Sequence, residues 1–211
     1  MPAPPRKRRP YAARMPVAER KQQILDAALQ VVVERGHGKV TMDTVAEEAG
    51  VTKPVVYSVF DSRAHLLAAL LKRERDAAVA QVVDALDAAH VDIARTPPDQ
   101  LLADVSRVYL NGVAAAPYRW RCILFAVDGA PEELRAAIDE ARELLRGLLG
   151  SLLTSLVARQ PEPPAVDIDI LSHSLVAFAE MAGRLLLDHP DRYDVDRLVR
   201  SATTLVRLVE P

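Results

Sequence analysis

Apolar side chains recur at helical spacing along most of the chain. In the first such stretch, from Val17 to Arg35, an apolar stripe alternates with charged and amide side chains, which is the pattern of an amphipathic helix. Gly36 and Gly38 end it. The same reading predicts further helices at Met42–Ala49, Thr52–Phe60, Arg63–Ala89, Asp99–Ala114, Arg119–Val127, Pro131–Arg159, Asp167–Asp188 and Asp194–Val209. Because no convincing strand is found, the predicted fold class is all-α, with about nine helices.

The first three predicted helices stand apart from the rest. Two short helices separated by a turn that contains Gly50 form a helix-turn-helix. We therefore divide the chain into a basic arm (1–16), a three-helix helix-turn-helix domain (17–62) and a larger helical domain (63–211). The arm contains five prolines and the cluster Arg6–Arg9. It has no core side chains, so it is expected to be disordered.

The composition of the 211 residues agrees with this fold class. Half of the chain is hydrophobic, with 8 Gly and 4% aromatic residues, which favours helices over a sheet. A single cysteine, Cys122, excludes an intramolecular disulfide and a cysteine-rich zinc site. No apolar run approaches the roughly 18–20 residues of a membrane span, and no secretory signal is found. We expect a soluble, cytoplasmic protein.

The net charge of −2 hides an uneven distribution. Residues 1–75 contain 14 Lys and Arg against 8 Asp and Glu, a net +6, whereas the remainder carries a net −8. A basic N-terminal third on an acidic body predicts an anionic partner for that third. Nucleic acid is the first candidate and a membrane surface the second.

The segment from Val40 to Leu67 has an ordered set of features. Thr41 begins the second helix, Ala49-Gly50-Val51 form the turn, and Thr52-Lys53-Pro54 open the third helix, before Tyr57, Phe60 and Ser62-Arg63. In this order they resemble the TetR family of transcriptional regulators. The resemblance covers about the first third of the chain. It implies a homodimer that binds a palindromic double-stranded DNA operator, most often to repress transcription, and a C-terminal domain that releases DNA when it binds a small-molecule effector.

The predicted recognition helix, Thr52–Phe60, has two faces. The major groove admits one α-helix, whose N-terminal residues reach the base edges. Lys53 could reach guanine or a phosphate, and Tyr57 could donate to a phosphate. Val56 and Phe60 lie on the opposite face and are expected to be buried. The predicted DNA-binding residues are Thr41, Thr52, Lys53, Pro54, Val55, Tyr57, Ser58 and Arg63.

Some of these assignments have alternatives. Thr41 and Thr52 are explained equally well as helix caps. Asp43 departs from the pattern, since an acid in the first turn of the second helix repels phosphate, and that helix is predicted to read little of the DNA. The arm either follows the DNA or is only a solubilising tail.

Enzyme signatures are lacking in the sequence. There is no phosphate-binding loop and no G-x-S-x-G motif, and the five histidines are scattered. Cys122 lies in an apolar run and is interpreted as a core residue. We expect no enzyme activity, no metal and no cofactor. The alternative function is a helical binding or scaffold protein whose basic N-terminal segment contacts membrane or acidic partners.

The larger domain gives weaker signals. Its few large or polar-tipped side chains either line a ligand pocket or fill a plain core: Tyr109, Tyr118, Trp120, Phe125, His173 and Phe178. Glu180 and Arg184 are spaced as a surface pair. Two apolar stripes predict a four-helix dimer interface, with Ser174, Ala177 and Gly183 as small residues on neighbouring faces, unless both stripes face the protomer's own core. The interface residues are Leu171, Leu175, Phe178, Ala182, Leu198, Ala202 and Leu205.

Overall fold

The computed structural model describes residues 15–90, 92, 95–125, 132–160 and 165–207. Within these ranges it contains nine α-helices, one short 3-10 helix (η1, His37–Lys39) and no strand, which confirms the all-α prediction. The α-helices are α1 Val17–Arg35, α2 Met42–Glu48, α3 Lys53–Tyr57, α4 Arg63–Ala88, α5 Pro98–Ala115, α6 Pro117–Leu124, α7 Glu132–Val157, α8 Ile168–Asp188 and α9 Val195–Arg207.

Two helix bounds differ from the prediction in an instructive way. The helix α6 begins at Pro117, two residues before the predicted start at Arg119. Proline is tolerated in the first turn of a helix, where its missing N–H has no partner to lose. The helix α3 is shorter than predicted and ends at Tyr57. Val127 and Val209, the predicted ends of two helices, lie outside the described residues.

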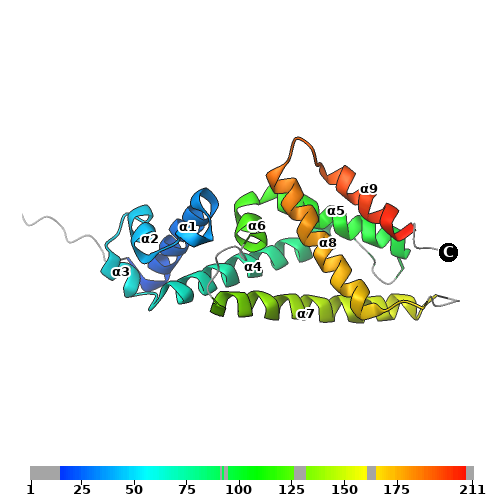
Figure 1. The fold of residues 1–211 in the computed structure, drawn as a ribbon, viewed down its shortest axis with the longest axis horizontal. Helices are drawn as coiled ribbons and strands as arrows, with labels where there is room; N and C mark the ends of the chain where they lie inside the picture. The colour runs from blue at the N-terminus through cyan, green and yellow to red at the C-terminus, as the bar shows by residue number, and fades with distance from the viewer. Residues whose placement is uncertain (1–14, 91, 93–94, 126–131, 161–164, 208–211) are drawn as a thin grey trace, which may run out of the picture.

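The helices are arranged along one long axis (Figure 1). The helices α1, α2 and α3 gather at one end, and α4 leads from them along the molecule. The helix α7 runs alongside α4, and α5, α8 and α9 form the other end. The N-terminal group is therefore joined to the rest chiefly through α4 and through contacts of α6 with α1 and α4.

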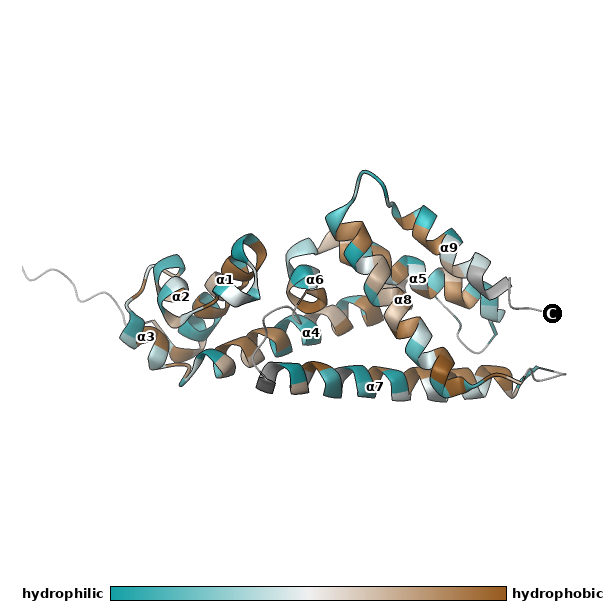
Figure 2. Cartoon of the chain, viewed as in Figure 1, coloured by the Kyte–Doolittle hydropathy of each residue, from teal (hydrophilic) through white to brown (hydrophobic). Residues whose placement is uncertain are grey.

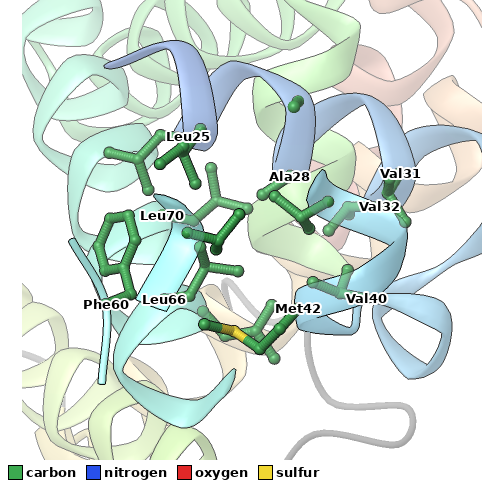
Figure 3. Close-up of a cluster of buried hydrophobic side chains, with 14 of the residues drawn as sticks. Leu25, Ala28, Val31, Val32, Val40, Met42, Phe60, Leu66 and Leu70 are labelled. Carbon is green, nitrogen blue, oxygen red and sulfur yellow. The ribbon is translucent and has the colours of Figure 1, made fainter. Parts of the chain in front are cut away.

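One hydrophobic core holds the N-terminal group together (Figure 3). Val56 and Phe60 are fully buried there, as predicted, against α1 and the first half of α4. Leu66 and Leu70 of α4 are fully buried in the same cluster. The first turns of α4 thus belong to this core, and the division at residue 62, which stays a prediction, would leave part of it out.

A buried polar network lies where α4 meets α1 and α6. The Arg73 guanidinium donates to Asp26 of α1 at 2.7 Å and to the neighbouring Glu74 at 2.8 Å. Glu74 is 4% exposed, and its carboxylate also lies 3.5 Å from the Nε of Arg119 on α6. A buried charge needs such partners, because removing it from water is costly. The network fixes α6 against the N-terminal core.

The far end of the molecule has a second packing centre around α5, α8 and α9. Leu110 of α5, Ala182 of α8, and Leu198 and Ala202 of α9 are all at most 5% exposed. Phe178 packs against the same cluster. Leu198, Ala202 and Ala182 therefore do not form a free dimer surface, and that part of the predicted interface is wrong: these side chains fill the protomer's own core.

The remaining predicted interface residues are Leu171, Leu175 and Leu205. Leu171 and Leu175 of α8 are half-buried. Leu205 lies outside the residues whose side chains the structure describes. The exposed side of α8 is a neighbouring stripe that includes Ile170, at 60% exposure, and Met181, at 44%.

The helix α8 is the most apolar of the long helices (Figure 2). By length and composition alone it would be able to span a membrane, with a mean hydropathy of 1.4 over 18 residues, contrary to our expectation that no stretch would. In the fold it packs against α5, α6 and α7. Its composition is thus explained in part by helix packing, but only 28% of that stretch is buried.

Candidate nucleic-acid interface

The N-terminus of α2 is fixed by a reciprocal cap. The Thr41 side chain accepts a hydrogen bond from the backbone N–H of Thr44 at 3.0 Å, and the Thr44 hydroxyl accepts one from the N–H of Thr41 at 2.9 Å. This capping box satisfies two of the N–H groups that a helix start leaves free. Thr41 therefore has a structural role, and its side chain is also exposed.

The turn between α2 and α3 depends on Gly50. Its φ of +64° lies in the left-handed region, which side chains with a Cβ rarely adopt. The N–H of Val51 then donates to the carbonyl of Ala46 at 2.9 Å, closing the end of α2. This turn sets the direction in which α3 leaves α2.

The helix α3 has one buried and one exposed side, as the sequence predicted. Val56 is fully buried, whereas Tyr57 is 46% exposed. Lys53 and Pro54 at its start and Ser58 at its end are exposed, and Val55 is half-buried. The structure therefore brings the predicted contact residues of α3 together on one solvent-facing surface.

Lys53 is paired with the acid that departed from the expected pattern. Its Nζ lies 2.9 Å from Oδ2 of Asp43, in the first turn of α2. The hydrogen bond and the charge of Asp43 raise the pKa of Lys53. Sequence reasoning named both residues and missed that they form a pair, because the segment 44–52 between them contains the turn.

Thr52 and Ser58, two of the predicted DNA-binding residues, differ in the hydrogen bonds of their side chains. Thr52 occupies the N-cap position of α3, but its side chain makes no capping hydrogen bond. The Ser58 hydroxyl donates to the carbonyl of Val55 at 2.7 Å. The interpretation of Thr52 as a side-chain cap is therefore wrong.

Arg63 is bound to the protein rather than directed to solvent. Its Nε donates to the carbonyl of Val40 at 2.6 Å, and one Nη donates to the carbonyl of His37 at 2.9 Å. The cap of α4 is Ser62, whose hydroxyl accepts from the N–H of His65. Arg63 thus braces the start of α4 against the loop before α2, which the prediction of a DNA contact did not foresee.

Four of the six pocket candidates are at least partly enclosed by the body of the protein. Tyr109 and Trp120 stack edge to face, with ring centroids 5.1 Å apart, and the Tyr109 hydroxyl donates to the carbonyl of Ala179 at 3.0 Å. Burial raises the pKa of Tyr109. Phe125 packs against the same cluster as Trp120, and Phe178 packs against the α5–α9 cluster.

The other two candidates face solvent. Tyr118 is 51% exposed, and the His173 side chain is 50% exposed. A solvent-open hollow of about 290 Å³ lies between the end of α4 and α5, lined in part by His90, Gln100 and Arg107, and none of the six candidates lines it. Glu180 and Arg184 do pair, but Glu180 also accepts two hydrogen bonds from Arg142 of α7. They belong to an inter-helix cluster, not a simple surface pair.

These observations define the class of protein: a helical protein that presents a helix-turn-helix to solvent at one end. Residues 24–70 match the family model described as "Bacterial regulatory proteins, tetR family". The related activator FasR of Mycolicibacterium smegmatis is 45% identical over 73 residues, which are 35% of this chain and 33% of FasR. The chain therefore matches only a third of that relative's length.

Solved structures extend the likeness of fold to nearly the whole chain. A TetR-like regulator from Rhodococcus sp. RHA1 has a TM-score of 0.71 at 24% identity, covering 92% of this chain and 97% of that one. The regulator FadR of Bacillus subtilis, in complex with stearoyl-CoA, has a TM-score of 0.68 at 20% identity, covering 88% and 96%. Residues 24–70 therefore match the tetR-family model, and the chain as a whole has the fold of these solved structures.

Proposed function

We propose that this protein binds a palindromic operator as a cytoplasmic homodimer and that a small, mainly apolar molecule releases it from DNA. The observation that carries the proposal is the two-sided α3. Its inward-facing Val56 is fully buried, and its outer face presents Lys53 and Tyr57. A helix held this firmly, with a cationic and an aromatic side chain outward, suits the major groove.

A palindrome requires two copies, and we place their contact on α7 and α8. Leu144 and Leu148 of α7 are 65% and 64% exposed, one turn apart. The adjacent α8 exposes Ile170 and Met181, with the small residues Ser174 and Ala177 between them. Exposed large apolar side chains on two packed helices favour burial against a partner. A second copy related by two-fold symmetry would form a four-helix contact from these faces.

An effector with at least one hydrogen-bond acceptor is supported by an unpaired donor on α6. The indole Nε1 of Trp120 is buried without a hydrogen-bond partner in the described part of the chain. A buried N–H without an acceptor costs about 1–3 kcal/mol, so a ligand oxygen at this point would be favourable. FadR of B. subtilis, which shares the fold, binds stearoyl-CoA. A ligand that prefers the DNA-free form lowers operator affinity by linkage.

We propose repression as the sense of regulation. A dimer on an operator that overlaps a promoter blocks transcription by occupancy alone. Activation, the role that FasR's name gives, needs a further contact with the transcription machinery. A promoter–reporter assay with and without the gene separates the two: higher reporter output in its absence is expected.

The primary test is selection of duplexes from random DNA, followed by affinity measurements at two salt concentrations. We expect a palindromic site and an affinity that falls steeply with salt. Selection of no sequence, together with binding to anionic vesicles, would instead support the alternative of a scaffold protein with a basic segment.

The dimer has its own test. Leu148→Arg should give a helical monomer by light scattering and circular dichroism, with lost operator affinity. Val79→Arg is the matched control, because Val79 is 63% exposed on α4, a helix outside the proposed contact. A wild-type monomer at micromolar concentration would contradict both the interface and the palindrome.

A further inference from the structure

The ion pair between Asp43 and Lys53 joins the first turn of α2 to the first residue of the recognition helix. Its two atoms are 2.9 Å apart, and the side chains are 69% and 48% exposed. Ion pairs this exposed contribute little to the free energy of unfolding, so stabilising the fold does not explain this pair. Its position at the start of α3 suggests another role.

The pair lies at the part of a helix-turn-helix that reaches the bases. The N-terminal residues of a recognition helix contact base edges in the major groove, and Lys53 is the first residue of α3. Because Asp43 is hydrogen-bonded to Lys53, its carboxylate is carried to the same place. A carboxylate there is repelled by phosphates, but it is a good acceptor for the amino group of cytosine.

We propose that Asp43 is a specificity-determining residue and that the Asp43–Lys53 pair reads one C·G base pair in each half-site. In the major groove, the cytosine amino donor lies beside the guanine O6 and N7 acceptors. The carboxylate of Asp43 accepts from the cytosine, and the ammonium of Lys53 donates to the guanine. The order of charges in the ion pair thus matches the order of donor and acceptors along the base pair.

The same pair also discriminates against other sequences. Opposite Asp43, a guanine or thymine would present acceptor oxygens to a carboxylate, which is repulsive. Specificity often rests on such unfavourable contacts with the wrong partner. Asp43 additionally lowers the affinity for non-specific DNA, because it compensates one positive charge of the surface. The inference rests on the proposed operator binding, and it assigns α2 a role in reading DNA that the sequence did not predict.

The test compares wild-type protein with Asp43→Ala, Lys53→Ala and Glu47→Ala. Each is subjected to selection from random duplexes, and affinities are measured for the best operator and its single-base variants. Glu47 is the matched control, since it is an exposed acid on the same helix. Circular dichroism confirms that each variant is folded.

We expect Asp43→Ala to lose about tenfold in preference for C·G at one position of each half-site, and to bind non-specific duplex more tightly. Lys53→Ala should lose preference at the same base pair, and Glu47→Ala should keep it. If wild-type protein selects a palindrome and Asp43→Ala retains every base preference, the inference is wrong while the operator stands. Changes at two different base pairs would also overturn it. If wild-type protein selects no sequence, operator binding and this inference fall together.

Discussion

Replacing Arg63 with alanine distinguishes a structural brace from a DNA contact. The guanidinium donates to two backbone carbonyls, at 2.6 and 2.9 Å, and both belong to the loop before α2. Val40 is fully buried and His37 is 4% exposed, so water replaces the lost donors poorly. Hydrogen bonds from charged groups contribute roughly 1.5–3 kcal/mol each.

The expected loss of stability follows from these bonds. Arg63 is half-buried, which reduces the contribution of each bond, so we expect Arg63→Ala to lower the free energy of unfolding by about 2 kcal/mol. For a chain of this size that corresponds to a fall in Tm of about 4–8 °C. Urea unfolding followed by circular dichroism measures the change. Lys72→Ala, which removes an exposed charge from the same helix, should change stability by less than about 0.5 kcal/mol.

The DNA measurement completes the test. A residue that neutralises a phosphate contributes about one to the slope of log affinity against log salt. We expect Arg63→Ala to keep the wild-type slope at temperatures where it is fully folded. A variant of unchanged stability whose slope falls by about one would refute the brace and restore the phosphate contact.

Two further predictions concern the body of the protein. Gly183→Ala would place a Cβ 2.6 Å from both the Leu124 Cδ1 and the Tyr109 hydroxyl, so urea unfolding should show a loss of about 1–2 kcal/mol. Gly112→Ala, whose Cβ meets its nearest atom at an ordinary 3.5 Å, should cause no loss; equal losses would contradict the packing. Burial raises the pKa of the Cys122 thiol to about 12 from an ordinary 9.0, so its contribution to stability is complete below pH 9 and is lost as pH rises towards 12. Wild-type protein should therefore lose stability faster than Cys122→Ala over that range, and parallel curves would contradict this.

Local pattern determined the helices and the helix-turn-helix. The spacing of apolar residues located α1 with the bounds the structure has, and α2 and α4 to within a residue. It also separated the buried Val56 from the exposed Tyr57, because side chains on one helix are placed by the helix period alone. The order of motifs from Val40 onward was sufficient to predict the match of residues 24–70 to the tetR-family model, since those residues lie close together in sequence.

Tertiary structure decided which partner each side chain meets. Asp43 and Lys53 are joined across a turn, and Arg63 reaches back to the loop before α2, so neither contact follows from helix period.

The dimer stripe shows the same limit. Periodicity placed Leu198 and Ala202 on one apolar face of α9, but whether that face meets α5 or a second copy depends on how distant helices pack. An apolar stripe on a helix indicates that this face is buried, but not against what. Only the tertiary structure shows that the α9 stripe is buried within the protomer, whereas Leu144 and Leu148 of α7 are exposed to solvent.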